Sequence, residues 1–395
     1  MTPSTDPASG AAAEPRRVAI TNVRVFDGER LSEPTTVVIE GGLIVSNADG
    51  AEEVDGANGV LLPGLIDAHV HLGKEGQLRQ MRDWGVTTAL GMGEWSVETL
   101  KMLRGRENQG LTDIRSSGLP ATVPGSFHSK MLPFPTRGLV AGAADATRFV
   151  TNRLAEGADY IKVIADVPGP DQATLDALVS AAHERGKLVV AHAATFTPFV
   201  MALEAKADVI THVPRDKALD DEAVARMVAD KRSSVPTLHM MGLITKPLSL
   251  GTILRLLFRP SLLLTIVSGF RSFSGTQTYE NAKESVARMH RAGVPILAGT
   301  DANEEQDSPF QVRHGEAMHR EMELLVEAGL STVDVLRAAT ALPAKHFALS
   351  DRGVVEPGKR ADLLLLRDDP IKDIRATRSI QRVWCGGIEH VRTYV

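Results

Sequence analysis

Histidines with the spacing of metal ligands recur at the ends of short apolar runs. His69 and His71 close the run LLPGLIDA as His-Val-His, and because side chains alternate along a strand, both imidazoles point to the same side. A single pair of this kind is more often solvated or packed in a core. Here His192 follows LVVA and His212 follows VIT, so two further runs end in the same way. The repetition predicts a convergent imidazole site for a metal ion.

Asp301 is the candidate carboxylate for this site. It closes the run ILAGTDA, where the small pair Gly299-Thr300 leaves room for close approach. A carboxylate in that place can bind a metal ion and also move protons. The alternative is that Asp301 is the N-cap of the following helix.

Lys162 stands in the middle of the apolar run DYIKVI. An unpaired ammonium inside a buried strand is costly, so it must lower its pKa or find a partner. If the side chain points into the site, a deprotonated lysine can add carbon dioxide. The carbamate then offers two oxygens that bridge two cations. The alternative is a lysine that reaches the rim of the strands and pairs with Asp166.

Short apolar runs of this kind alternate with helical segments from Val60 onward. The runs are VLLPGLIDAHVH, TTALGM, DIRSSGLP, DYIKVIAD, KLVVAHAA, DVITHVP, SVPTLHMM and PILAGTDA. Eight parallel strands with intervening helices close into a (β/α)8 barrel, or TIM barrel, whose functional residues lie at the C-terminal ends of the strands. We therefore predict an α/β barrel over residues 63–350.

The two ends of the chain have a different pattern. Residues 17–62 contain β-branched runs separated by Asp-Gly and Gly-Gly turns, and residues 351–395 return to strands and tight turns. We expect these segments to form one small β-sandwich domain beside the barrel. Residues 1–16 are rich in Ala, Ser, Thr and Pro and have no apolar signal region, so we expect a disordered leader on a cytoplasmic protein.

Composition narrows the classes of function. The 395 residues carry a formal net charge of -5, which offers no broad basic field for nucleic acid, so we expect a small-molecule substrate. The single cysteine, Cys385, rules out an intrachain disulfide and a cysteine-rich zinc site. Any metal must be held by His, Asp, Glu or a modified Lys.

The most apolar run of the chain, residues 248–270, is not expected to span a membrane. Arg255 and Arg259 would each cost about 2.5–3.5 kcal/mol near the centre of a bilayer, and Pro260 would interrupt the helix. We expect buried or interfacial amphipathic helices. The alternative is a lid or a dimer contact, and we expect a homo-oligomer.

These motifs together resemble the amidohydrolase superfamily, in particular the binuclear branch related to imidazolonepropionase-like and Xaa-Pro dipeptidase-like hydrolases. The resemblance spans nearly the whole chain. It rests on PGLIDAHVH, on GADYIKV, on His192 and His212, on GTDA, and on the C-terminal runs HREMELLVEAGLSTVDVLRAATALPA and GVVEPGKRADLLLL.

The resemblance implies a cage of six ligands and two divalent metal ions. One ion would be held by His69, His71 and Asp301, and the other by His192 and His212. Carboxylated Lys162 and a hydroxide would bridge the two. Zinc is the expected ion, although iron, manganese or nickel suit the same ligands. The hydroxide would attack the scissile carbonyl, and Asp301 would carry its proton to the leaving nitrogen.

The loops around this predicted site depart from the family pattern. Relatives often carry an Arg-Asp pair after the second strand, whereas this chain reads GMGEWSVE and places Glu94 and Trp95 at the barrel mouth. The loop after the third strand is PATVPGSFHSKMLPFPTRG, in which His128 and Lys130 could bind a substrate carboxylate or oxyanion, or could be solvated. The candidate substrate contacts are Glu94, His128, Lys130, His239 and, more weakly, Tyr160 and Asp166.

The predicted function is hydrolysis of a carbon-nitrogen bond, amide or peptide-like, in an N-acyl amino acid, a dipeptide or a cyclic amide. A mononuclear deaminase or lactonase that uses part of the cage, with Lys162 unmodified, is the alternative among enzymes. A non-catalytic scaffold that has lost its metals is the alternative outside them. The presence of all six ligands argues against the scaffold.

Overall fold

The computed structural model describes residues 17–94, 96–131, 134–246, 277–304 and 310–391. The predicted leader at 1–16, Trp95 and the apolar run at 248–270 lie outside these ranges. In the part that is described, no helix is both long and apolar enough to cross a membrane.

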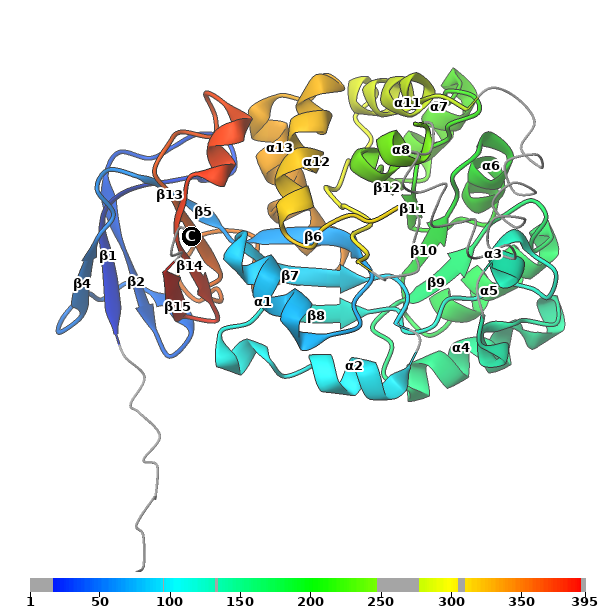
Figure 1. The fold of residues 1–395 in the computed structure, drawn as a ribbon, viewed down its shortest axis with the longest axis horizontal. Coiled ribbons are helices and arrows are strands. Elements are labelled where there is room, and N and C mark those ends of the chain that lie inside the picture. Colours follow the sequence, from blue (N-terminus) through cyan, green and yellow to red (C-terminus); the bar gives the residue numbers. More distant parts are fainter. Residues whose placement is uncertain (1–16, 95, 132–133, 247–276, 305–309, 392–395) are drawn as a thin grey trace, which may run out of the picture.

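Strands from the two ends of the chain lie side by side in one eight-stranded sheet (Figure 1). They are β1 (Val18–Val25), β2 (Thr35–Glu40), β3 (Leu43–Val45), β4 (Glu52–Asp55), β5 (Val60–Pro63), β13 (Leu363–Leu366), β14 (Ile380–Cys385) and β15 (Ile388–Val391). The order is β15-β14-β13-β5-β1-β2-β3, and β4 pairs with β1 off this path. The shared sheet is observed, whereas the two-layer sandwich and the domain limits at 62 and 351 stay predictions.

The run expected to be the first barrel strand is in fact two strands. β5 pairs antiparallel with β13, whereas β6 (Leu65–Val70) pairs parallel with β7 (Val86–Gly91). The break falls at Gly64, whose N–H donates to the carbonyl of Asp362 (2.7 Å). A Cβ at Gly64 would lie 2.2 Å from Oγ1 of Thr87, so only glycine fits where the chain changes sheets.

Seven parallel strands follow the expected order in two sheets, β6-β7-β8 and β9-β10-β11-β12. The remaining bounds are β8 (Asp113–Ser116), β9 (Ile161–Ile164), β10 (Val189–His192), β11 (Val209–Thr211) and β12 (Ser233–Val235). Isolated bridges join the sheet edges, from Ala121 to Val163, from Ser234 to Ile296 and from Val70 to Ala302. The eighth run forms no ladder in the described residues, so the α/β architecture is observed but a barrel closed by eight regular strands is not.

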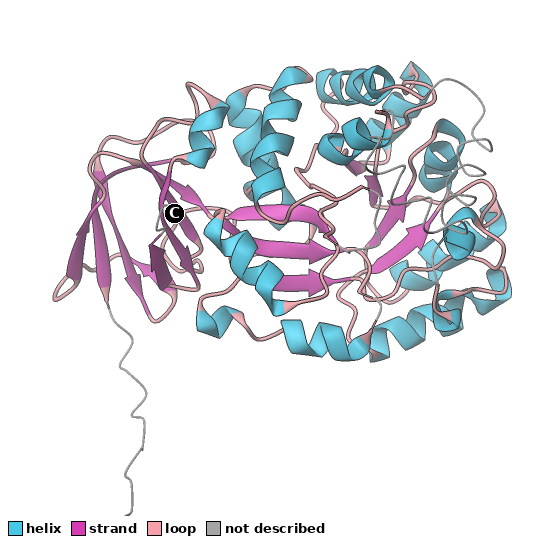
Figure 2. Ribbon diagram, viewed as in Figure 1, coloured by secondary structure: helices cyan, strands magenta, loops and turns pink. Residues whose placement is uncertain are grey.

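Helices lie on the outside of these parallel strands (Figure 2). They are α1 (Glu75–Asp83), α2 (Val97–Leu103), α3 (Phe127–Met131), α4 (Ala146–Ala155), α5 (Gln172–His183), α6 (Phe196–Glu204), α7 (Asp221–Ala229), α8 (Leu238–Ile244), α11 (Tyr279–Arg291), α12 (Glu316–Glu327), α13 (Thr332–Ala338) and α14 (Ala341–His346), with short 3-10 turns η1 (Glu107–Gln109), η2 (Thr136–Gly138), η3 (Ala143–Asp145) and η4 (Ile374–Arg378). Amphipathic spacing explains their packing. In α11, Ala282, Ser285, Val286 and Met289 are buried at helical intervals on one face.

Arg352 ties the terminal sheet to the parallel strands. Its side chain is 2% exposed, and its Nη1 donates to Oδ2 of Asp113 in β8 (2.7 Å) and to Oγ1 of Thr88 in β7 (2.9 Å). The same atom lies 3.8 Å from Oδ2 of Asp362, just before β13. Two buried carboxylates from different sheets therefore share one guanidinium.

We expect Arg352→Met to lower the free energy of unfolding by about 3 kcal/mol, because it leaves the buried Asp113 without its closest cation. Arg360 still pairs with Asp362 (2.8 Å), which limits the loss. Arg367→Met is the control, since Arg367 pairs with Asp368 at the exposed surface and should cost less than about 1 kcal/mol. Urea unfolding of both variants measures the difference, and equal losses would contradict the assignment.

Candidate metal centre

The ends of the parallel strands bring the predicted ligands together. His69 lies in β6 and His71 directly after it, and their Nε2 atoms lie 3.3 and 3.0 Å from Oδ1 of Asp301. Both imidazoles therefore point to the same side of the chain, as their alternation predicts. Nε2 of His212, which follows β11, lies 3.8 Å from Oδ2 of the same carboxylate.

Asp301 lies at the centre of this group. Its backbone has φ +57°, an uncommon conformation for a residue other than glycine, and its N–H donates to the carbonyl of His69 (2.8 Å). Ala302 and Asn303 form β-bridges and Gly315 precedes α12, so the N-cap alternative is wrong. Burial alone would raise the pKa of Asp301, but His212 and His71 beside it hold the pKa below its ordinary value.

His192 and His212 face each other at the end of β10 and β11. Nδ1 of His192 lies 3.1 Å from Nε2 of His212. Burial lowers the pKa of His212 to about 3 and that of His192 well below its ordinary value, so both rings are neutral near pH 7. Since Nδ1 of His212 contacts Oγ1 of Thr237, its Nε2 remains to present a lone pair to a cation.

Lys162 in β9 is buried beside these rings. Burial lowers the pKa of its amine to about 7, and Nζ has no hydrogen-bond partner among the described residues. The alternative of a rim pair with Asp166 is not observed, because that carboxylate contacts His128 and His192 instead. A buried amine without a partner beside convergent imidazoles fits a lysine that takes up carbon dioxide and becomes a ligand.

Two threonine hydroxyls orient the histidine rings, and the sequence reasoning missed both. Oγ1 of Thr211 lies 2.7 Å from Nδ1 of His69, and Oγ1 of Thr237 contacts Nδ1 of His212. Each hydroxyl engages one ring nitrogen and leaves Nε2 toward Asp301. The available signal was weak, since Thr211 merely precedes a histidine in the sequence.

Asp67 and Arg215 were also missed. Asp67 is buried, burial raises its pKa to about 6, and it accepts bonds from Oγ1 of Thr300 (2.7 Å) and the N–H of His69 (3.2 Å). It therefore fastens the end of β6 to the segment that carries Asp301. Arg215 follows β11 and is 5% exposed, and its charge contributes to the lowered pKa values of His192 and His212.

His128 and Lys130 both lie in α3, but only His128 contacts the other candidate ligands. Nδ1 of His128 is in short contact with Oδ2 of Asp166, and its ring centroid lies 4.6 Å from that of His192. Lys130 is exposed. The described residues hold two groups with ligand atoms within 4.8 Å of one another, and the structure brings His128 into one of them. The groups are His69, His212 and Asp301, and His128, Asp166 and His192.

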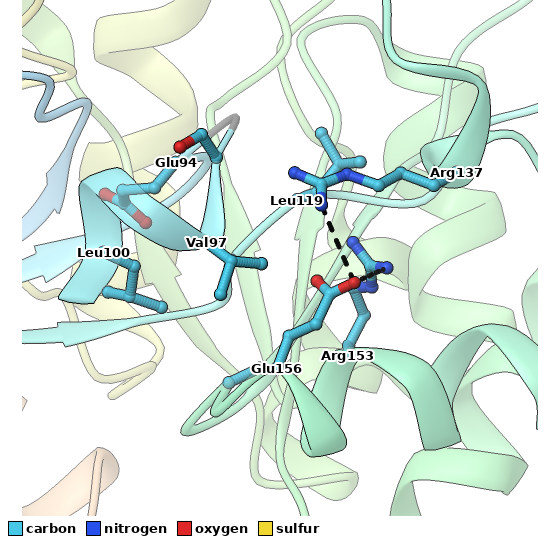
Figure 3. Close-up of a pocket in the computed structure, with 10 residues that line it drawn as sticks. Glu94, Val97, Leu100, Leu119, Arg137, Arg153 and Glu156 are labelled. Atoms are coloured by element: carbon cyan, nitrogen blue, oxygen red, sulfur yellow. Dashed lines mark hydrogen bonds and ion pairs between the residues drawn. The ribbon is translucent and has the colours of Figure 1, made fainter.

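Glu94 is buried behind His71. Burial raises its pKa to about 7, and the hydrogen bond that Oγ of Ser116 donates to Oε2 opposes this shift. A Cβ at Gly93 would lie 3.3 Å from Nδ1 of His71, so this loop packs against the imidazole. Glu94 also lines a small pocket in which Glu156 faces Arg137 and Arg153 (Figure 3). None of the six predicted ligands lines that pocket, so it is not the metal site.

Tyr160 and His239 do not lie where the sequence reasoning placed them. Tyr160 is 2% exposed, its ring packs on Phe347, and its hydroxyl donates to the carbonyls of Gly91 and Arg115, so the substrate-contact prediction is corrected to a core role. His239 does not end a strand but lies in the first turn of α8, where its N–H donates to Glu321 (2.7 Å). Its partly buried side chain stays a candidate contact.

We expect Thr211→Val to weaken the binding of one metal ion by about 10–100-fold, because His69 loses the hydroxyl that fixes its ring. Valine matches threonine in shape and suits a strand, so the thermal midpoint should change little. Thr151→Val on the exposed face of α4 is the control, since that hydroxyl only donates to the carbonyl of Thr147. Competition with a chromophoric chelator measures affinity, and unchanged binding would exclude this role for Thr211.

The amidohydrolase family model matches residues 60–389 of the chain, which therefore belongs to that family. The predicted family and the general class of enzyme, a metal-dependent hydrolase, are confirmed at this level.

Individual relatives are distant. Adenine deaminase of Gluconobacter oxydans (strain 621H) is 24% identical over 382 residues, or 91% of this chain, but the chain spans only 57% of its length. Imidazolonepropionase of Pyrobaculum arsenaticum is 36% identical over 83 residues, 21% of this chain and 20% of the relative. A crystal structure of a Xaa-Pro dipeptidase with bound methionine has a TM-score of 0.79 at 23% identity, and covers 95% of this chain and 100% of that one. This likeness supports the fold alone.

Proposed function

We propose that the chain hydrolyses a carbon-nitrogen bond, amide or peptide-like, at a binuclear metal centre in a (β/α)8 barrel flanked by a small β-sandwich. The observation that supports this most strongly is the set of possible metal ligands around Asp301. The imidazole nitrogens converge there, and the buried amine of Lys162 lies beside them. The ligands are His69, His71, His192, His212, Asp301 and carboxylated Lys162, and zinc is the proposed ion.

The chemistry of the donors supports two divalent cations. Neutral imidazoles and carboxylates are the ligands that zinc prefers, and a lysine carbamate adds two oxygens. When bound, such cations lower the pKa of a bridging water toward neutrality and polarise the scissile carbonyl.

Asp301 would move the proton. Its carboxylate is held ionised by the surrounding imidazoles, so it can accept a proton from the attacking water. The water oxygen bonds to the carbonyl carbon, the carbon-nitrogen bond breaks, and the proton passes from Asp301 to the leaving nitrogen. The products are a carboxylic acid and an amine.

Arg215 favours an anionic substrate. It is a buried guanidinium close enough to the β10 and β11 histidines to influence their pKa values, and burial lowers its own pKa to about 10, so it remains charged. A guanidinium recognises a carboxylate well, which favours an N-acyl amino acid or a dipeptide. Glu94, Lys130 and His239 stay candidates for contacts with the rest of the substrate.

We expect Asp301→Asn to lower turnover at least about 10²-fold, because an amide cannot accept and return the proton. Asp368→Asn, at an exposed position after β13, should leave turnover unchanged. Metal content and thermal midpoint are measured beside activity, so that a lost ion or an unfolded chain is recognised. Full activity in the Asp301 variant would contradict the proposed role of Asp301 in proton transfer.

We also expect about two metal ions per chain and a carbamate on Lys162. Metal analysis gives the first, and ¹³C NMR after exchange with ¹³C-bicarbonate gives the second. Lys162→Met, which suits the buried site, should lose both the carbamate signal and tight binding of one ion. One ion and a free amine in the wild-type protein would support the mononuclear alternative.

Deamination of a purine is the second candidate, because adenine deaminase aligns with 91% of the chain. The deciding experiment presents metal-replete protein with N-acyl amino acids, dipeptides, lactones and adenine. Release of an amino acid from the first two classes supports the proposal. Release of ammonia from adenine, without hydrolysis of any amide, would instead show that the chain is a deaminase.

A further inference from the structure

Asp166 and His128 form a pair beside the histidine contributed by β10. Asp166 lies two residues beyond the end of β9, and its Oδ2 is in short contact with Nδ1 of His128. Its other oxygen, Oδ1, lies 3.8 Å from Nε2 of His192. One carboxylate thus faces two imidazoles that come from different elements.

The two ring nitrogens of His192 have different surroundings. Nδ1 faces Nε2 of His212 inside the centre, whereas Nε2 faces Asp166. A neutral imidazole carries one proton, and the nitrogen that binds a cation must present its lone pair. If Nδ1 is the ligand, the proton lies on Nε2, and Oδ1 of Asp166 is the acceptor toward which it points.

Local contacts hold the pair in place. The N–H of Phe127 donates to the carbonyl of Pro168 (2.9 Å), which fastens α3 to the loop after β9. The ring of His128 packs edge-on against His192, with centroids 4.6 Å apart and planes at 77°. The side chain of Asp166 is only 12% exposed. The carboxylate is therefore fixed between the two rings.

From these contacts we propose that Asp166, held by His128, is a positioning residue that sets the tautomer and ring orientation of His192 for one of the two cations. The inference rests on the proposed function, because it takes His192 as a ligand. It gives His128 a role other than the substrate contact expected from the sequence.

The test compares Asp166→Ala with Asp166→Asn in the full chain, by titration of the metal-free protein with Zn²⁺ against a chromophoric chelator. The alanine variant should bind one of two ions about 10–100-fold more weakly and the other as before. The asparagine variant keeps an oxygen for Nε2 of His192, and its amide can donate to His128. It should therefore bind both ions within a few-fold of wild type.

Asp176→Ala on α5 is the matched control, because that exposed carboxylate only accepts a bond from Gln172. It should bind both ions like the wild type. Circular dichroism and thermal unfolding establish that each variant is folded.

His128→Ala is the second variant, and it serves if Asp166→Ala does not fold. It should weaken the same ion, while KM at saturating Zn²⁺ stays unchanged. A raised KM with unchanged metal affinity would instead make His128 a substrate contact and overturn the inference.

Two further results would overturn it and leave the proposed function intact. One is an Asp166→Ala variant that binds both ions as tightly as wild type. The other is loss of a third ion present in the wild type, because His128, Asp166 and His192 would then be ligands themselves. If the wild-type chain binds fewer than two ions, the proposed binuclear centre itself is wrong, and this result is distinguishable because it does not depend on the variants.

Discussion

The burial of the Lys162 amine among imidazoles is the constraint on which the centre depends. The amine has no hydrogen-bond partner in the described part of the chain, and burial lowers its pKa to about 7. Burial also keeps the rings of His192 and His212 neutral near pH 7. The ring nitrogens and the Asp301 carboxylate therefore present more lone pairs than there are protons to share. Divalent cations and a carbamate would resolve the imbalance without adding protons to any ring.

Rigid strand ends make that arrangement possible. The rings of His69 and His212 are each fixed at Nδ1 by a threonine hydroxyl, from Thr211 and Thr237 respectively. Asp67 fastens the β6 end to the Asp301 segment in the same way. Rings held at one nitrogen lose little freedom on binding a metal, which preserves affinity. The order of the parallel strands therefore decides which donors meet.

The candidate metal ligands could be predicted from the sequence, but the residues that hold them in place could not. His69, His71 and Asp301 could be recognised because such residues recur at the ends of several apolar runs, and the C-terminal ends of parallel strands meet at one face. Gly64 could not be recognised as a change of sheet, because the apolar run continues through it and only Thr87, distant in sequence, explains the glycine. Tyr160 was misplaced for a similar reason, since its depth in the core depends on Phe347.

Charge, more than fold, separates the two candidate reactions. The dipeptidase structure and the adenine deaminase are both distant relatives, at 23% and 24% identity, so neither decides between an amide and a purine. Adenine is neutral, whereas an N-acyl amino acid or a dipeptide carries a carboxylate. Arg215 is a buried cation near the histidines of β10 and β11, and it stays charged because burial lowers its pKa only to about 10. A guanidinium recognises a carboxylate well and gains nothing comparable from neutral adenine, so we favour the amide reaction.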